Sequence, residues 1–308
     1  MTATRSLSGR LSAYARLAKL AFFDFYLSSL VAWTLIGRPD RLGARELAVL
    51  LLLTLAWVLT VAATVAFDDV TGFRDGSDNR NYAPDQAALR SVKRKPLLVG
   101  ELSVAEAVRF GYAMTLGAVV LLASAFAVAP QRPAYAAGLM AVVVVGSVQY
   151  SYGLRLSYRW GQEIILFLSP ALTIIIPAAL LTGTPWRLVV PEAVLFGLWS
   201  VLISAYSNLN DIEGDRLARR KNVATAVSRQ NYRLFLAALL AAELTAIGFG
   251  ASAEPLLAVA LLPLLAMRFR QFHGWFTTFN ALAARKLGIT ALRCGVAGLC
   301  VANLIIIR

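Results

Sequence analysis

Carboxylate side chains gather in two polar segments, each directly after a long apolar run. The first segment follows the apolar run 47–67 and holds Asp68, Asp69, Asp75 and Asp78. The second segment, S-N-L-N-D-I-E-G-D at 207–215, holds Asn208, Asn210, Asp211, Glu213 and Asp215. At about 100° per residue along a helix, Asn208, Asp211 and Asp215 share one face, whereas Glu213 points away. Two acidic faces are therefore predicted at the ends of two apolar helices.

Oxygen ligands of this kind favour Mg²⁺, which binds one or two carboxylates and completes its shell with water and phosphate oxygens. Acids at the C-terminal end of a helix oppose its dipole, so two such clusters indicate a compensating cation. His273 is the only histidine, and Cys294 and Cys300 stand in an apolar run. Histidine triads and cysteine–histidine metal sites are therefore excluded. The alternative is two helix ends that are merely solvated.

Basic residues follow each acid cluster along the chain. They are Lys93, Arg94 and Lys95 after the first cluster, and Arg216, Arg219, Arg220 and Lys221 after the second. Acids that hold a metal ion beside bases that hold oxyanions are what a diphosphate site requires. The residues therefore predict a metal–diphosphate site, with a charged loop that has no such site as the alternative.

Membrane-spanning helices must position these segments. The chain is 58% hydrophobic and only 15% charged, outside the range of ordinary soluble domains. A spanning helix needs roughly 20 apolar residues. The runs that qualify are 15–37, 46–68, 104–129, 134–154, 162–183, 189–210, 231–251, 253–270 and 287–307. The sequence therefore predicts an all-α integral membrane protein of nine transmembrane helices, a single domain over 1–308 whose first run is retained rather than cleaved as a signal peptide.

Lys and Arg fall mainly in alternate loops. The N-terminal segment and the long loops 69–103 and 211–230 carry most of them, whereas the loops of the other side carry few. By the positive-inside rule, the N-terminus and both acid-bearing loops are cytoplasmic and the C-terminus is outside. The net charge of +13 then belongs to a membrane surface that attracts anionic lipid headgroups and anionic substrates. No nucleic-acid partner is predicted.

Three stretches resemble motifs of the UbiA superfamily of intramembrane prenyltransferases. The stretch N-L-N-D-I-E-G-D-R-L-A-R-R-K-N-V-A-T at 208–225 is similar to the second aspartate motif of this superfamily, D-x-x-x-D. The stretch K-R-K-P-L-L-V-G-E-L-S at 93–103 resembles the one that follows the first motif. The Tyr-rich stretch Y-S-Y-G-L-R-L-S-Y-R-W-G-Q-E at 150–163 resembles the segment after the fourth helix. The resemblance covers about 15–307, and nine helices is the count of the superfamily.

The first motif departs from the superfamily pattern, N-D-x-x-D-x-x-x-D. Its first two positions read D-D, and Gly72 and Gly76 fall where the next acids belong. Asp75 and Asp78 supply acids at shifted positions. The metal ligands implied by the resemblance are Asp68, Asp69, Asp75, Asp78, Asp211 and Asp215.

The resemblance implies a central cavity that opens to the cytoplasmic face, where Mg²⁺ ions held by the two acid motifs grip an isoprenyl diphosphate. Metal and basic side chains stabilise the diphosphate as the allylic C–O bond ionises, and the helix walls keep water from the carbocation. Glu163 begins an apolar helix, where an ionisable group indicates function. The implied catalytic residues are Asp69, Asp75, Asp211, Asp215, Glu163 and Tyr150. The implied diphosphate-binding residues are Lys93, Arg94, Lys95, Arg155, Arg216 and Asn208.

The fate of the carbocation separates the functions that fit this sequence. Capture by an aromatic or other lipophilic acceptor makes the protein a prenyltransferase. Capture by double bonds of the prenyl chain itself makes it a UbiA-type membrane terpene cyclase. An ion-coupled transporter is the third alternative, although its acids are expected at the midplane of broken helices rather than at helix ends.

Overall fold

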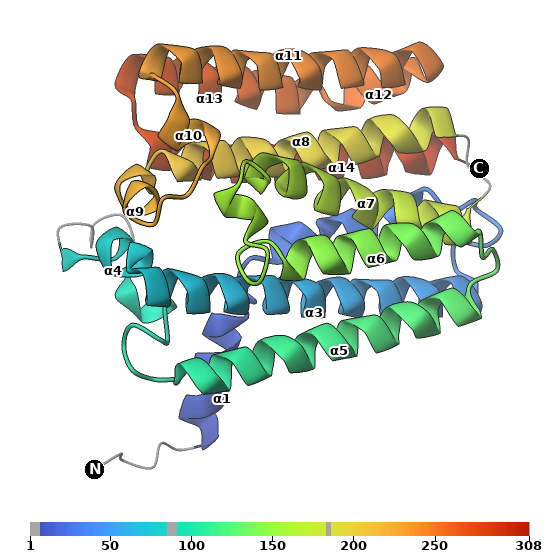
Figure 1. The fold of residues 1–308 in the computed structure, drawn as a ribbon. Helices are drawn as coiled ribbons and strands as arrows, with labels where there is room; N and C mark the ends of the chain where they lie inside the picture. Colours follow the sequence, from blue (N-terminus) through green and yellow to red (C-terminus); the bar gives the residue numbers. More distant parts are fainter. Residues whose placement is uncertain (1–6, 85–90, 183–185, 308) are drawn as a thin grey trace.

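The computed structural model of the chain describes residues 7–84, 91–182 and 186–307, which form helices and connecting turns without a β-strand among them. The described helices that are long and apolar enough to cross a membrane are α3 (Ala44–Asp75), α5 (Val104–Val128), α7 (Gln162–Leu181), α8 (Trp186–Asn208), α11 (Arg229–Ala253) and α14 (Ala281–Ile306). They run along a common direction, as Figure 1 shows. The protein is therefore an all-helical, multi-pass integral membrane protein.

Shorter helices complete the bundle. They are α6 (Ala134–Val148), α12 (Pro255–Ala260) and α13 (Leu262–Thr278). Helix α6 is apolar but short, and α12 and α13 together cover the predicted run 253–270 as two pieces. With six long apolar helices in the described part of the chain, the predicted count of nine is not confirmed. Residues 1–6 and 308, which hold the two termini, lie outside the described residues, as does residue 183 at the predicted end of the fifth run.

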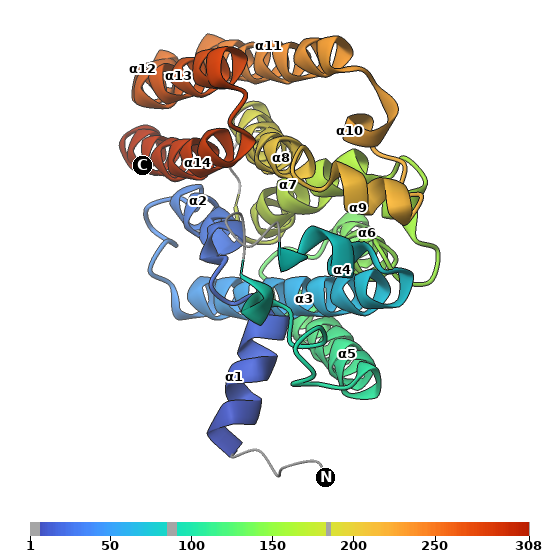
Figure 2. The ribbon, with the colours of Figure 1, turned by 90° about the vertical axis from the view of Figure 1, so that its left-hand side faces the viewer.

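The prediction of one continuous helix over 15–37 is wrong. In its place the structure has α1 (Leu7–Leu17), η1 (Phe23–Leu27) and α2 (Ser28–Thr34). Lys19 has a φ of +51°, which takes the backbone out of the right-handed helical region. Irregular backbone at membrane depth is tolerated where it is buried or lines a cavity, and Phe22, Asp24 and Phe25 of this break line the cavity described below. Helix α1 runs across the direction of the long helices (Figures 1 and 2).

Small residues set the close approaches between the long helices. The ring of Phe67 in α3 fills the space that a side chain at Gly111 in α5 would need, and Trp199 in α8 does the same at Gly295 in α14. Helices in a membrane associate largely through such close packing, because lipid tails are as apolar as the side chains themselves. The packing of α3 on α5 and of α7 on α8 therefore holds together the two walls that carry the acid segments.

A buried ion pair joins three helices away from the acid segments. The guanidinium of Arg268 in α13 donates to Glu243 in α11, with 2.9 Å between Nε and Oε2. The indole Nε1 of Trp199 in α8 donates to Oε1 of the same carboxylate at 2.7 Å. Gln271 accepts from Arg268 at 2.7 Å. Arg268 and Glu243 are 2% and 0% exposed, so this network is a polar clamp inside the apolar bundle.

The short helices that carry polar residues lie together at one end of the bundle. They are α4 (Ser77–Asn81), η3 (Val92–Arg94), η4 (Leu156–Tyr158), α9 (Ile212–Leu217) and α10 (Val223–Ala226). Figure 2 looks onto this end, where α4 packs against α9. Helix α3 extends to Asp75, beyond the predicted end at residue 68, and stops at Gly76 with a φ of +81°. Glycine adopts this left-handed conformation without strain, so it ends the helix there.

Candidate active site

A cavity of about 310 Å³ lies among α3, α7, α8 and α14, beside α4 and α9. The predicted site residues that line it are Asp68, Asp78, Asp211, Asp215, Asn208, Tyr150, Arg94 and Lys95. Its apolar lining includes Val61 and Val65 of α3, Leu166 of α7, Phe196 of α8 and Leu292 of α14. The fold therefore brings both acid segments, which lie far apart in sequence, to one cavity with an apolar wall.

The second acid segment begins where α8 ends. Asp211 is the N-cap residue of α9, and Asp215 lies one turn further along. The helix does not continue from Asn208 to Asp215 as the predicted shared face assumed, yet Asn208, Asp211 and Asp215 all line the cavity. Glu213 points away from it, as predicted: 71% of its side chain is exposed and it forms an ion pair with Arg80 of α4.

A chain of amide side chains fixes the orientation of this segment. Asn222 donates to Oδ2 of Asp215 at 2.8 Å and to Oε1 of Gln162 at 3.1 Å. Gln162 in turn donates to Oδ1 of Asn208 at 3.0 Å. Asp215 is 4% exposed, and this burial raises the pKa of its carboxyl to about 6 even though Arg220 acts in the opposite direction. An acid held in this state gains strongly from a cation that approaches it.

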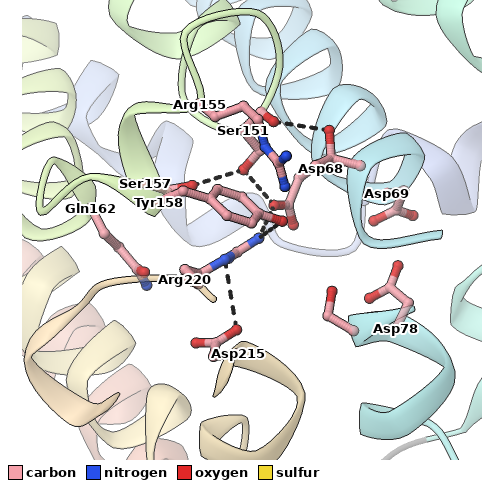
Figure 3. A network of polar contacts seen from close by, with 12 residues as sticks. Asp68, Asp69, Asp78, Ser151, Arg155, Ser157, Tyr158, Gln162, Asp215 and Arg220 are labelled. Carbon is pink, nitrogen blue, oxygen red and sulfur yellow. Dashed lines mark hydrogen bonds and ion pairs between the residues drawn. The ribbon is translucent and has the colours of Figure 1, made fainter. Parts of the chain in front are cut away.

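Arg220 connects the two acid segments. Its Nη2 donates to Oδ1 of Asp68 at 3.1 Å, and its Nε lies 3.6 Å from Oδ1 of Asp215. Asp68 also accepts a hydrogen bond from Oγ of Ser151 at 2.6 Å. Figure 3 shows Arg220 between Asp68 and Asp215. The sequence pattern included Arg220 among the basic residues after the second motif but did not single it out. Arg219 with its φ of +55° turns the chain at this point, and such a turn leaves no mark in the residue types.

Lys95 occupies the centre of the first acid segment. Its Nζ lies 2.7 Å from Oδ1 of Asp69 and 2.8 Å from Oδ2 of Asp78. Lys19 approaches the same oxygen of Asp69 at 3.1 Å. Burial alone would lower the pKa of Lys95, but the carboxylates of Asp69 and Asp78 raise it well above its ordinary value. Lys95 is therefore a fixed ammonium ion, and Lys19 is a contact that the residue pattern did not reveal.

Gly72 and Gly214 make room for side chains from α4. A Cβ at Gly72 would lie 2.7 Å from Cγ of Asp78, so the carboxyl group of Asp78 fills the space beside position 72. A Cβ at Gly214 would lie 2.3 Å from Oδ1 of Asn81. The superfamily pattern expects an acid at position 72. The carboxylate of Asp78 therefore lies beside position 72, where the superfamily pattern has an acid in the sequence.

Asp75 does not line the cavity. Its Oδ2 accepts from Tyr158 at 2.5 Å and from Arg155 at 3.1 Å, and its Oδ1 accepts from the backbone and hydroxyl of Ser77. The ring of Tyr158 lies against the guanidinium groups of Arg155 and Arg220, at 3.9 and 4.6 Å. Asp75 therefore joins α3 and α4 to the Tyr-rich loop, whereas Asp78 reaches the cavity.

Glu163 and three of the predicted diphosphate-binding residues also lie outside the cavity lining. Oε1 of Glu163 accepts from the backbone N–H of Val223, at the start of α10, at 3.0 Å. Lys93 is exposed on η3, Arg155 pairs with Asp75, and Arg216 lines a separate pocket beside α10 and α13. Asp69 is buried behind Lys95, with 1% exposed. Tyr150, an implied catalytic residue, lines the cavity.

The second acid segment has the composition of a Mg²⁺ site. Its residues Asp211, Asp215 and Asn208 carry carboxylate and amide oxygens, which a hard divalent cation prefers. Within the described ranges, no three acids, histidines or cysteines are placed to hold a metal ion by themselves. Mg²⁺ binds through one or two carboxylates and completes its shell with water and substrate phosphate. The second segment fits this requirement.

Comparison with known proteins agrees with this architecture and confirms the resemblance read from the sequence. Digeranylgeranylglyceryl phosphate synthase is 11% identical, with a TM-score of 0.69 over 96% of this chain and 99% of that one. A UbiA homolog from Archaeoglobus fulgidus bound to DMAPP and Mg²⁺ is 15% identical, with a TM-score of 0.66 over 93% and 98%. Its complex with GPP and Mg²⁺ is 16% identical, with a TM-score of 0.64 over 93% and 99%.

At these identities the solved structures show the shared fold alone. No curated protein matches the sequence. The family comparison is direct, because residues 26–293 match the UbiA prenyltransferase family. The chain belongs to the UbiA prenyltransferase family.

Proposed function

We propose that this protein is a Mg²⁺-dependent intramembrane prenyltransferase that ionises an isoprenyl diphosphate and transfers the prenyl group to an aromatic or other lipophilic acceptor. The observation that carries this proposal is a single cavity in which Asp211 and Asp215 face Arg220 and Lys95 beside an apolar wall. The A. fulgidus homolog, bound to DMAPP or GPP together with Mg²⁺, supports the same pairing of metal and isoprenyl diphosphate here.

The polar half of the cavity binds the diphosphate. Asp211, Asp215 and Asn208 would hold Mg²⁺, which supplies positive charge to the diphosphate as it leaves. Arg220 and Lys95 line the same cavity and donate hydrogen bonds to oxyanions. Both cations are already oriented by carboxylates, so little reorganisation is needed when the C–O bond breaks.

The apolar half of the cavity holds the prenyl tail and protects the carbocation. Val65, Leu166, Phe196 and Leu292 present no nucleophile, so their wall excludes water from the cation. Tyr150 lines the cavity. In this proposal its ring stabilises positive charge at the end of the tail nearest the diphosphate.

Two acids act around the site. Glu163 holds the backbone of α10 and so positions the loop that carries Asn222, which orients Asp215. Asp24 lines the cavity in the break between α1 and α2 and is paired with Arg293 of α14 at 2.6 Å. In this proposal Asp24 is a polar contact for the lipophilic acceptor.

The site lies on the cytoplasmic face in this proposal, with the N-terminus on the same side and the C-terminus outside. The support is the charge distribution, because the loops at the site end of the bundle carry most of the Lys and Arg. The donor then arrives from the cytoplasmic leaflet, whose anionic surface also attracts these basic loops.

Product analysis tests the proposal. Purified protein in lipid nanodiscs is incubated with Mg²⁺ and geranylgeranyl diphosphate or shorter donors, with and without a panel of phenolic and quinone-precursor acceptors. We expect consumption of the donor to depend on an acceptor and to yield a prenylated product. A free cyclic hydrocarbon formed without acceptor identifies a terpene cyclase instead. No turnover of any donor, in protein shown to be folded, would contradict both enzymatic functions.

A further inference from the structure

The first acid segment of this chain encloses a cation that belongs to the protein itself. Asp69 and Asp78 hold Nζ of Lys95 between them at 2.7 and 2.8 Å. The three side chains are 1%, 7% and 5% exposed. An ammonium group has three N–H donors and no acceptor. Two donors are directed to these carboxylates, and a third is left for the cavity that Lys95 lines.

Every acid of this segment already has a cationic partner. Asp68 pairs with Arg220, which also approaches Asp215, Asp69 with Lys19 and Lys95, Asp78 with Lys95, and Asp75 with Arg155. Buried ions are stable only when they are paired in this way. A divalent cation added here would either leave an excess of positive charge or displace a buried ammonium ion. The second segment differs, because Asp211 and Asp215 share the cavity with Arg220, which also serves Asp68.

The glycine at position 72 of the first motif is linked to the position of Lys95 through Asp78. Gly72 stands where the superfamily pattern has an acid, and Cγ of Asp78 lies 2.7 Å from the position of a Cβ there. Asp78 enters from α4, so its carboxylate approaches Asp69 from the opposite side of the gap that Lys95 fills. The rearranged acid therefore completes a pocket for an ammonium ion.

We propose that Lys95 takes the place of a metal ion at the first motif, so that the protein binds its diphosphate with one Mg²⁺ at the second motif and one fixed ammonium at the first. This inference rests on the proposed function and adds the number and kind of cations at the site. A lysine cannot dissociate as an ion does, so one part of the grip on the diphosphate is independent of the Mg²⁺ concentration. The first-motif acids then orient Lys95 rather than coordinate metal.

Counting bound Mn²⁺ tests this inference without reference to turnover. Electron paramagnetic resonance measures Mn²⁺ bound per chain at saturation, with inorganic pyrophosphate as the probe of the site. We expect one ion in the wild type, none in Asp215→Asn, and one in Asp78→Asn, because Asp78 holds the lysine. Lys95→Ala frees Asp69 and Asp78 and should raise the count to two, whereas Lys95→Arg should leave it at one. Lys286→Ala, exposed on α14, is the matched control with one ion.

The outcomes separate this inference from the proposed function. Two ions in the wild type, a loss of one ion in Asp78→Asn, or an unchanged count in Lys95→Ala would each overturn the replacement of metal by Lys95 and leave a metal–diphosphate site in place. Failure of the wild type to bind Mn²⁺ with pyrophosphate would overturn the proposed function itself. If Lys95→Ala does not fold, Asp78→Asn and Lys95→Arg still decide the question, because they keep the volume of the original side chains closely.

Discussion

At the scale of single residues, the site depends on which acid reaches the cavity and what orients it. The carboxylates of Asp211 and Asp215 line the cavity, whereas Glu213, only two positions from each, is exposed and pairs with Arg80. A helix turn separates the first two and directs them to one side. Sequence spacing predicted this division, and the structure bears it out.

Substitution should distinguish the two acids that line the cavity, Asp211 and Asp215, from the exposed Glu213. Asp211→Ala and Asp215→Ala should each lower turnover on the order of 10²-fold or more, because each removes a carboxylate from the proposed metal clamp on the leaving group. Glu213→Ala is the matched control and should stay within a few-fold of wild type. Steady-state prenyl transfer with folded protein is the measurement. Near-normal rates in both aspartate variants would contradict the assignment of the second motif.

Position 72 offers a second test at this scale. Gly72→Ala should lower donor binding on the order of 10-fold, because the new Cβ would lie 2.7 Å from Cγ of Asp78 and push this carboxyl group away. Gly72→Asp combined with Asp78→Ser should recover part of the loss, since the acid then returns from the other helix. Gly146→Ala, where no atom lies within 4 Å of the new Cβ, is the control and should bind like wild type. Equal binding by Gly72→Ala and Gly146→Ala contradicts the role given to Asp78.

Residue-level features differ in how far a sequence can reveal them. The sequence indicated two acid segments that meet at one cavity, and Asp68, Asp78, Asp211, Asp215 and Asn208 do line it. The choice of Arg220 over its basic neighbours could not be predicted, since it follows from the left-handed turn at Arg219. The distinction between Asp75 and Asp78 was equally hidden. It depends on where α3 stops, at Gly76, and on how α4 folds back beside Gly72.

At the scale of elements, the long helices act as rigid supports and the short ones carry the chemistry. Helix α3 brings Asp68 to the cavity and Asp69 to Lys95, and α4 turns back to add Asp78. Helix α8 ends at Asn208, and the second motif continues through the turn to Asp211 and into α9. The polar clamp of Glu243 with Arg268 fixes α8, α11 and α13 relative to one another inside the bundle.

Removal of one partner of this clamp should be costly for folding. Arg268→Met leaves the carboxylate of Glu243 buried and uncompensated, which should lower the free energy of unfolding by about 3–5 kcal/mol. Arg270→Met is the matched control, because Arg270 lies on the same helix but is exposed, and it should change stability little. Unfolding in mixed micelles followed by circular dichroism measures both. The same stability in the two variants would show that the clamp does not hold the bundle.

The break in the first predicted helix shows what an apolar run conceals. Residues 15–37 are apolar enough to span a membrane, yet the chain leaves helical geometry at Lys19 and resumes it at Ser28. A high hydropathy shows that a segment avoids water. It does not distinguish a helix that spans the bilayer from a segment that lines an apolar cavity. Lys19 and Asp24 are charged residues inside this run, but charged residues also occur in other runs, such as Glu192 in 189–210 and Glu243 in 231–251.

At the scale of the whole molecule, the arrangement follows from burying apolar helices and exposing polar ends. Family membership and the all-helical membrane fold could be predicted from composition and motifs. The number of full crossings could not, because short or divided helices such as α6, α12 and α13 read as complete spans when only apolar residues are counted.

The proposed orientation can be tested with single cysteines. Thr277→Cys lies at the site end of α13 and Ser252→Cys near the opposite end of α11, and both native side chains are exposed. In a Cys294→Ser and Cys300→Ser background, a membrane-impermeant maleimide added to intact cells should label Ser252→Cys only. In inside-out vesicles it should label Thr277→Cys only. The reverse pattern would invert the topology and move the site to the outer face.

The central claim is that one cavity binds an isoprenyl diphosphate through Mg²⁺ held at the second motif. Equilibrium binding of a non-ionisable thiolodiphosphate analogue of geranylgeranyl diphosphate tests it most directly, because binding needs neither acceptor nor turnover. We expect tight binding with Mg²⁺, a large loss on EDTA treatment that Mg²⁺ reverses, and the same loss in Asp211→Ala with Mg²⁺ present. A zinc-selective chelator should have no effect. Binding that is equally tight with EDTA, and unchanged in Asp211→Ala, would contradict the account.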